Sequence, residues 1–391
     1  MKVGVIGVGN MGSQYTQMIL DHTIPGMELG AVTRIKPQYV AIISRCKHEN
    51  IPVYYDAEEL LNAVQNNKLS LDAVIITTPQ LSHAEIAVRA FDCGLHVLCD
   101  KPSGVYLSQA TLMNRKAAES GKCFGMVFNQ RTSPLYQRMK EIVASGIYGK
   151  LKRVNWIVTD WYRPEPYYKT SSWKATWSMD GGGVLLNQCP HNLDLLQWIC
   201  GMPVSVQGFC HNGRFHDIEV EDDVTAYLQW ENGANGTFIT STGDAPGINR
   251  LEISLEEAML VCENGELRIG ELAPELGMKE EIYRKTSTDF FRKINGVWKT
   301  EKQPTAGNSY QLILTDFAKA CEAYASNETY ELIAPGAEGR NSLLLTNAVY
   351  LSSWEHRMVT LPLPGTPEEQ EFEIAFKMKM ATNITKHGIS V

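Results

Sequence analysis

A glycine-rich turn after the first apolar segment is the feature that most constrains how this chain can fold. Residues 2–6 (KVGVI) are expected to form a strand, and residues 7–12 (GVGNMG) follow it and open a helical pattern. At this spacing Gly7 allows a tight turn, Gly9 lets a pyrophosphate approach the backbone, and Gly12 lets the helix pack closely on the sheet. The free N–H groups at the start of the helix then bind phosphate oxygens. The residues expected to contact a dinucleotide here are Gly7, Gly9, Asn10, Met11 and Gly12.

The rest of residues 1–128 alternates between strand and helix patterns. Apolar runs at 28–33, 71–77, 96–99 and 123–128 are separated by amphipathic segments of helical length. This alternation predicts an α/β domain with a doubly wound parallel sheet, the Rossmann arrangement.

From residue 129 the pattern changes. Residues 129–365 are expected to form an α+β domain with a large, open, mostly antiparallel sheet. Hairpin signals are the Asn-Gly pairs at 232–233, 235–236 and 264–265. Neither residues 271–306 nor the tail, 366–391, shows a pattern that predicts a structure.

The second strand ends without the acidic residue that usually binds the adenosine ribose of NAD. Residues 31–34 read AVTR, which puts Arg34 at the acid position, with Thr33 before it. An arginine there can pair with a 2′-phosphate, so the sequence favours NADP over NAD. The alternative is that Arg34 stacks on the adenine or faces solvent in an NAD-dependent protein.

Composition excludes several other classes. The chain of 391 residues has 44% hydrophobic residues and a net charge of −8, which argues against a disordered chain and against nucleic acid as a partner. Nine cysteines without a C-x-x-C pair indicate reduced thiols in a cytoplasmic protein. The sequence also lacks an apolar stretch of membrane-spanning length. The histidines are scattered and predict no metal site, and His211 and His216 are expected on a solvated turn.

A lysine stands where this fold usually places its chemistry. The run Asp100-Lys101-Pro102 follows the strand at 96–99, so Lys101 lies at the carboxyl end of a parallel strand. Far downstream, residues 181–194 read GGGVLLNQCPHNLD. This segment places His191 after a triple glycine and a short apolar run.

With these two segments and the glycine turn, the sequence resembles the Gfo/Idh/MocA oxidoreductases, the glucose–fructose oxidoreductase and inositol dehydrogenase family. The resemblance extends to about residue 360 and implies that Lys101 and His191 are the catalytic pair. It also implies that a segment beside the nicotinamide is formed by Thr77, Thr78, Pro79 and His83, with Asp100 next to the lysine. One position departs from the family: Asn187 stands where an aspartate is common, four residues before the histidine.

The chemistry of such a site needs a proton acceptor for a hydroxyl group and stabilisation of the charge that develops on oxygen. His191 suits the role of general acid/base because imidazole titrates near neutral pH. Lys101 suits the role of orienting and stabilising the hydroxyl, although the two roles can be exchanged. Asn187, His191 and Asp194 are spaced to share one helix face, and Asn187 is expected to orient substrate hydroxyls.

A segment dense in aromatic residues follows the predicted long strand at 152–160. Trp161, Tyr162, Arg163 and Trp173 are candidates to bind the ring of a pyranose or cyclitol in a pocket between the domains. The alternative is that these aromatic side chains belong to the core or to a subunit interface.

Together these features predict an NAD(P)-dependent oxidoreductase that moves a hydride to or from a hydroxyl-bearing carbon of a sugar, glycoside or cyclitol. Two alternatives stay open: a lyase or glycosidase that retains its dinucleotide and oxidises a sugar transiently, and a non-catalytic dinucleotide sensor. The predicted sheet within 204–270 has more surface than its own helices can cover. Its apolar face and the resemblance both suggest a homodimer or homotetramer.

Overall fold

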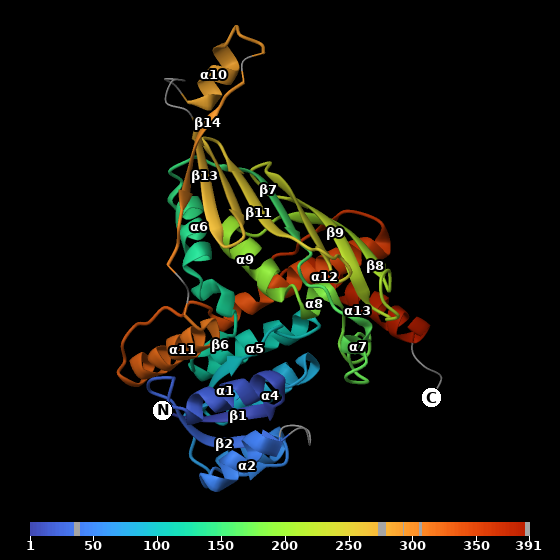
Figure 1. Cartoon of the computed structure of the whole chain (residues 1–391). Coiled ribbons are helices and arrows are strands. Elements are labelled where there is room, and N and C mark those ends of the chain that lie inside the picture. Colours follow the sequence, from blue (N-terminus) through green and yellow to red (C-terminus); the bar gives the residue numbers. More distant parts are fainter. Residues whose placement is uncertain (35–39, 273–278, 292, 305–306, 388–391) are drawn as a thin grey trace. The chain divides into compact units, whose positions relative to one another are not determined.

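The computed structural model describes residues 1–34, 40–272, 279–291, 293–304 and 307–387 (Figure 1). By its internal contacts the chain divides into two compact units. The first contains Met1–Thr132 and Ala306–Leu343, and the second contains Ser133–Thr305 and Leu344–Val391. Residues 307–343, which were expected in the second domain, therefore pack with the first unit.

The first unit is built on a six-stranded sheet in which every neighbouring pair is parallel. Its strand order, β3-β2-β1-β4-β5-β6, is that of the dinucleotide-binding fold. The strands are β1 (Lys2–Val8), β2 (Glu28–Arg34), β3 (Val53–Tyr54), β4 (Ala73–Ile76), β5 (His96–Cys99) and β6 (Phe124–Met126). Because β4 and β5 are buried at every position, they do not alternate, and all their residues except His96 are apolar. The predicted Rossmann domain is confirmed.

Helices connect and cover these strands. They are α1 (Asn10–Leu20), α2 (Val40–His48), α3 (Ala57–Gln65), α4 (His83–Asp92), α5 (Leu107–Ser120), the short turns η2 (Gln80–Ser82), η3 (Asn129–Thr132) and η5 (Gly336–Glu338), and α11 (Ser309–Ala325). Helix α11 is distant in sequence but buries Ile313, Leu314 and Phe317 in the same hydrophobic core as β5 and β6. This burial explains why the helix belongs to the first unit.

The second unit contains a nine-stranded sheet in the order β14-β13-β12-β11-β7-β10-β9-β8-β15. All neighbouring pairs are antiparallel except β7 and β10, which are parallel. The strands are β7 (Leu151–Val158), β8 (Ser205–Asn212), β9 (Glu221–Gln229), β10 (Asn235–Ser241), β11 (Asn249–Leu255), β12 (Ala258–Glu263), β13 (Glu266–Leu272), β14 (Gly296–Glu301) and β15 (Val359–Thr360). The predicted open, mostly antiparallel sheet is confirmed.

The two faces of this sheet differ in burial. Alternate residues along β9, β10 and β11 are fully buried, and the residues between them are mostly half-buried. Helices α6 (Pro134–Ser145) and α9 (Pro190–Cys200) lie along one face (Figure 1). The remaining helices are α7 (Glu165–Tyr168), α8 (Val184–Asn187), α10 (Glu280–Thr286), α12 (Gly339–Glu355), which begins in the first unit, and α13 (Pro367–His387).

The segment in which Asn187, His191 and Asp194 were expected to share one helix face forms two helices. Helix α8 ends at Asn187, and α9 begins at Pro190 with Cys189 as its N-cap. Proline has no N–H to continue a helix but fits its first turn, so the chain breaks just before it. His191 and Asp194 therefore share α9, but Asn187 does not share a helix face with them, and that prediction was wrong.

Three other segments differ from the sequence expectations or extend them. Residues 235–236 lie inside β10 rather than at a turn, whereas Asn264 and Gly265 form the expected tight turn, both with positive φ. The described part of 271–306 contributes the end of β13, then α10 and β14, and the tail contains α13. In the described part of the chain, every helix is too short or too polar to span a membrane.

Candidate active site

The turn between β1 and α1 has the geometry of a phosphate-binding loop. Gly7 has a φ of +102°, and a Cβ on Gly12 would stand 2.3 Å from the Gly7 carbonyl oxygen, so both positions require glycine. A Cβ on Gly9, in contrast, would meet nothing closer than 3.9 Å, so this side of the turn is open. Gly9 is the N-cap of α1 and supplies no side-chain cap, which leaves the first N–H groups at Asn10 and Met11 for an anion. These residues fit a dinucleotide pyrophosphate.

The end of β2 lies beside this turn. The Gly7 N–H donates a hydrogen bond of 2.9 Å to the hydroxyl of buried Thr33, which ties the turn to β2. The Arg34 side chain is exposed, and its guanidinium lies 4.8 Å from the centre of the Tyr55 ring. Thr33 is therefore a structural residue of the turn, whereas Arg34 presents a cation at the position that faces the ribose in this fold.

The end of β4 is attached to the same turn. The Thr77 hydroxyl donates to the Gly7 carbonyl at 2.7 Å. Thr78 and Pro79 then lead into η2 and α4, where the Ser82 hydroxyl donates to the Thr78 hydroxyl at 2.8 Å. The resemblance implied that these residues lie beside the nicotinamide, and the structure brings Thr77 next to the glycine turn.

The end of β5 carries Asp100 and Lys101. Asp100 is buried, and its carboxylate accepts the Lys101 backbone N–H at 2.8 Å. His83 lies beside them, with Nδ1 2.8 Å from the Pro102 carbonyl oxygen and Nε2 2.7 Å from that of Thr78. Lys101 itself is half-buried. The lysine is thus held at the carboxyl edge of the sheet by a buried acid and a buried imidazole.

Burial dominates the electrostatics of this group. It raises the pKa of Asp100, and the positive charge of Lys101 opposes part of that rise. Burial also lowers the pKa of His83, although its two carbonyl contacts and nearby Asp100 favour the protonated ring. Both ring nitrogens face carbonyl oxygens, and a neutral ring can donate to only one of them.

In the second unit a buried glutamate supports the triple-glycine segment. The Glu221 carboxylate accepts hydrogen bonds from the Gly183 N–H at 2.9 Å, the Leu185 N–H at 2.9 Å and the Tyr350 hydroxyl at 2.7 Å. A Cβ on Gly183 would stand 1.9 Å from the Glu221 carbonyl oxygen. Burial raises the pKa of Glu221 to about 7, although all three donors oppose the rise. The sequence offered no signal for this residue.

Asn187 faces a carboxylate that the sequence analysis did not single out. Its Nδ2 lies 3.3 and 3.4 Å from the two oxygens of Asp180, which is buried and also accepts the Ala175 N–H at 2.9 Å. Gln188 donates to the Tyr167 hydroxyl at 3.3 Å. A small cavity of about 10 Å³ is lined by Tyr167, Tyr168, Lys174, Ala175, Asp180, Gly183, Asn187 and Gln188. An acid directly before a glycine run was the available signal for Asp180.

The predicted substrate residues follow β7 but do not form one uniform surface. Trp161 and Arg163 are half-buried, Tyr162 is exposed, and Trp173 is half-buried on a separate turn. The Trp161 indole N–H is buried and has no hydrogen-bond partner among the described residues. The neighbouring Trp177 is buried, and its indole N–H donates to the Glu219 carbonyl. Trp177 therefore belongs to the core, whereas Trp161 keeps an unused donor.

His191 and Asp194 are both buried in α9, in its first and second turns. Cys189 is also buried, with its sulfur 3.0 Å from the Thr240 hydroxyl, which agrees with a packing role. His216 was expected on a solvated turn, and that prediction was wrong. It is buried, with Nδ1 2.9 Å from Asp222 and Nε2 2.7 Å from the Arg163 carbonyl oxygen. It thereby fixes the loop that carries Arg163.

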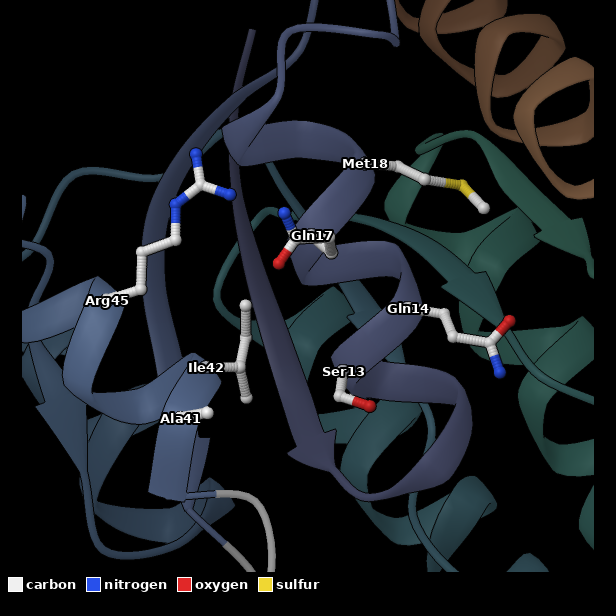
Figure 2. A pocket seen from close by; sticks show the side chains of 7 residues that line it. All are labelled: Ser13, Gln14, Gln17, Met18, Ala41, Ile42 and Arg45. Carbon is white, nitrogen blue, oxygen red and sulfur yellow. The ribbon is translucent and has the colours of Figure 1, made fainter.

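A larger hollow lies elsewhere in the first unit. A groove of about 670 Å³ runs between α1 and α2 and is lined by Ser13, Gln14, Gln17, Met18, Ala41, Ile42 and Arg45 (Figure 2). Arg45, its one cation, pairs with Asp21 at 2.6 Å and Glu49 at 2.7 Å. None of the residues predicted to bind the cofactor lines this groove. Its size therefore does not make it the candidate site.

Comparisons with known proteins agree with this geometry. Residues 1–128 match the model of an oxidoreductase family with an NAD-binding Rossmann fold, and residues 136–261 match the GFO/IDH/MocA C-terminal domain. The strand order, the glycine turn, and Asp100 and Lys101 at the carboxyl edge of the sheet are features of dinucleotide-binding oxidoreductases. The chain belongs to the Gfo/Idh/MocA family, so the resemblance seen in the sequence is confirmed.

Individual relatives are distant. The uncharacterized oxidoreductase YdgJ of Escherichia coli K12 is 27% identical over 216 residues, which is 53% of this chain and 55% of YdgJ. Scyllo-inositol 2-dehydrogenase (NADP(+)) IolW of Bacillus subtilis is 23% identical over 92% of this chain and 96% of its own length. The match therefore spans little more than half of YdgJ but nearly all of IolW.

Solved structures support the fold. The WlbA dehydrogenase from Bordetella pertussis, in complex with NADH and UDP-GlcNAcA, has a TM-score of 0.72 at 23% identity, covering 93% of this chain and 99% of that one. Levoglucosan dehydrogenase, in complex with NADH and levoglucosan, has a TM-score of 0.72 at 19% identity, covering 93% and 100%. At these identities the likeness is one of fold.

The first prediction concerns Glu221. Its pKa is about 7 in the folded chain against an ordinary value of 4.5, so the folded state binds the proton more tightly than the unfolded state. The resulting stabilisation is complete below the unfolded pKa and is lost as the pH rises through about 7. The loss corresponds to roughly 3 kcal/mol.

Glu221→Gln keeps one acceptor oxygen but turns an amide N–H₂ toward a backbone donor. We expect it to be less stable at every pH and to lose this part of the pH dependence. Urea unfolding at pH values on either side of neutrality measures the effect, with exposed Glu231→Gln as the matched control. Equal slopes of stability against pH in wild type and Glu221→Gln would contradict the assignment.

Proposed function

We propose that this protein is an NAD(P)-dependent dehydrogenase that moves a hydride between the nicotinamide and a hydroxyl-bearing carbon of a sugar, glycoside or cyclitol. The observation that carries the proposal is the carboxyl edge of the parallel sheet in the first unit, where an open glycine turn follows β1 and Lys101 follows β5, with β4 between the two strands. Dehydrogenases of an inositol and of levoglucosan among the similar proteins support the substrate class.

In this proposal the dinucleotide, when bound, supplies the hydride chemistry. Lys101 donates a hydrogen bond to the reacting hydroxyl and stabilises the charge that develops on its oxygen. His191 accepts the hydroxyl proton during oxidation and returns it during reduction. Asn187 and Asp180 orient further hydroxyls of the substrate. The carboxylate accepts hydrogen bonds from hydroxyl groups, and the amide can donate or accept them.

The substrate side of the proposal draws on the segment after β7. The buried indole N–H of Trp161 lacks a partner among the described residues, so a substrate oxygen can satisfy it. The Lys174 ammonium lies 4.1 Å from the centre of the Tyr167 ring, and both residues line the small cavity that Asp180 also lines. Aromatic faces beside such polar groups suit a polyhydroxylated ring. Tyr162, Arg163 and Trp173 extend the proposed binding region.

The test of the function is a screen of polyols and glycosides with NAD and NADP as oxidants. Turnover with one substrate class supports the proposal. A dinucleotide that stays with the purified protein through catalysis, without net reduction, would instead indicate the lyase or glycosidase. Dinucleotide binding without turnover of any substrate would indicate a sensor. No described feature favours either alternative.

The second prediction concerns the catalytic pair. On the best substrate from that screen, Lys101→Ala and His191→Ala should each lower turnover by about 10²–10⁴-fold, the usual cost of losing a positioned acid or base. Binding of NADH or NADPH, followed by fluorescence titration, should remain measurable. Lys116→Ala and His22→Ala, at exposed or pairing positions away from the site, are the controls. Near-normal turnover in either site variant would remove that residue from the mechanism.

The third prediction concerns the cofactor, for which we propose NADP. Arg34 presents an exposed guanidinium at the end of β2, where a 2′-phosphate would lie. Arg34→Asp should therefore raise the KM for NADP much more than the KM for NAD. The exposed Arg115 of α5 offers a matched control, because Arg115→Asp makes the same charge change on another face. Equal effects of Arg34→Asp on both cofactors would refute the preference for NADP.

The fourth prediction concerns assembly and location. We propose a homodimer or homotetramer formed through the face of the nine-stranded sheet whose residues, such as Ile157 and Ile239, are only half-buried. Such an interface should bury more than about 1,000 Å². Light scattering during size exclusion should give a multiple of 43.7 kDa, and the single-chain mass at micromolar concentration would refute the oligomer.

Because all nine cysteines are free thiols, we place the protein in the cytoplasm.

A further inference from the structure

A histidine and two cysteines that are far apart in sequence meet in the first unit, away from the candidate active site. The ring of His96, the sulfur of Cys123 and the sulfur of Cys321 lie within 4.8 Å of one another. His96 begins β5, Cys123 directly precedes β6, and Cys321 lies in α11. The cluster is therefore at the amino edge of the parallel sheet. Lys101 follows the opposite, carboxyl end of β5, on the order of 10 Å along the strand.

Several contacts fix the approach of the two cysteines. The Cys123 N–H donates to His96 Nδ1 at 2.9 Å, and the Cys123 sulfur lies 3.5 Å from the Ala320 carbonyl oxygen, one residue before Cys321. The Tyr324 ring, one turn further along α11, packs edge-on against His96 with 4.8 Å between ring centres. Thus the start of β6 lies directly against this turn of α11.

We propose that Cys123 and Cys321 form a redox-active thiol pair, which a hydroperoxide converts into a reversible disulfide between β6 and α11. Cys123 is the attacking thiol, and Cys321 is the resolving thiol. The site is separate from the dehydrogenase chemistry, and the proposal does not depend on it.

The two thiols differ in the ways that these roles require. Cys123 is half-buried and so within reach of a small oxidant, whereas Cys321 is 4% exposed. Hydrogen bonding from the Cys321 thiol, then from His96, and the charge of Lys122 lower the pKa of Cys123 to about 5, although burial opposes this. The same hydrogen bond, together with burial, raises the pKa of Cys321. These effects favour the thiolate on the attacking sulfur and the protonated thiol on the resolving sulfur.

Two charged groups near Cys321 shift its pKa in opposite directions. The Asp72 carboxylate raises the pKa of Cys321, and the N-terminal ammonium of Met1 lowers it. Neither outweighs the neighbouring Cys123 sulfur. The thiolate form of Cys123 gives up its contact with the Ala320 carbonyl, which costs little because a thiol is a weak donor.

The chemistry balances in two steps. The Cys123 thiolate attacks the outer oxygen of a hydroperoxide, the O–O bond breaks, and one proton from water completes the alcohol and leaves a sulfenic acid on Cys123. The Cys321 sulfur then attacks the Cys123 sulfur, the S–O bond breaks, and the leaving hydroxide takes the Cys321 proton to form water. Two thiols are oxidised and one hydroperoxide is reduced to an alcohol and water.

The hydrogen bond at His96 argues for this chemistry over metal binding. Nδ1 accepts the Cys123 N–H, so the proton of a neutral ring lies on Nε2. Ligation of a metal through Nδ1 would break that hydrogen bond, and ligation through Nε2 would move the ring proton to Nδ1, where it would face the Cys123 N–H. A soft metal ion such as Zn²⁺ is accordingly the competing outcome of the test.

The experiment uses the full chain, purified under reducing conditions and then exposed to hydrogen peroxide at about one equivalent. Peptide mass spectrometry without reduction should find a Cys123–Cys321 disulfide before any other of the nine thiols is modified, and dithiothreitol should remove it. In Cys321→Ser, dimedone should trap a sulfenic acid on Cys123. In Cys123→Ser, Cys321 should stay unmodified. Cys93→Ser, which removes another half-buried thiol of the first unit, should leave the disulfide unaffected.

The pH dependence of alkylation tests whether Cys123 is the attacking thiol rather than only a close neighbour of Cys321. Alkylation of Cys123 in the reduced wild type should be nearly independent of pH above about 6, whereas His96→Gln should shift the profile toward higher pH. Three results would overturn the proposal: oxidation of other thiols first, sulfenic acid on Cys321 rather than Cys123, or one tightly bound Zn²⁺ per chain that protects both thiols. Because the first and third are read on the wild type, they stand even if a variant fails to fold.

Discussion

The close contact between the start of α1 and the end of β1 is the constraint on which the first unit depends. A side chain on Gly12 would collide with the Gly7 carbonyl oxygen, and Gly7 itself has a left-handed φ. These two glycines bring the helix N-terminus down onto the sheet edge, where Thr33 and Thr77 bond to the turn from either side. Gly9 lies between these two positions and keeps open space beside it, so the backbone of the turn can accommodate an anion.

In the second unit, a buried carboxyl group holds the start of a helix. Three glycines let the chain pass under Tyr350 and Glu221, where a Cβ on Gly182 or Gly183 would collide. The Glu221 carboxyl then satisfies the N–H groups that open α8, a task that an exposed N-cap residue performs in most helices. Burial makes this carboxyl costly to ionise, so the segment that leads to Asn187 and His191 is held by a group poised near neutral pH.

What the sequence predicted well was local. The glycine turn, the strand at 96–99 and the alternating strands of the second sheet follow from patterns a few residues long, and the structure contains all of them. What it could not predict depends on long-range packing. Helix α11 joins the first unit because its apolar face meets β5 and β6, and the contact between Cys123 and Cys321 joins positions almost 200 residues apart. The spacing of Asn187 and His191 predicted one helix face, yet the break before Pro190 places the two residues on separate helices.

The asparagine at 187 acquires a physical reason from Asp180. In place of the acid common in the family, this chain has an amide whose Nδ2 lies 3.3 and 3.4 Å from the two Asp180 oxygens. A carboxylate at 187 would put two negative charges at that distance in a largely buried pocket, and each would raise the pKa of the other. Asp180 is already fixed by the Ala175 N–H, and that residue has a positive φ, so the turn presents its amide to the carboxylate. The carboxylate of this pocket is thus at position 180, and the amide at 187 is a side chain that can donate to it.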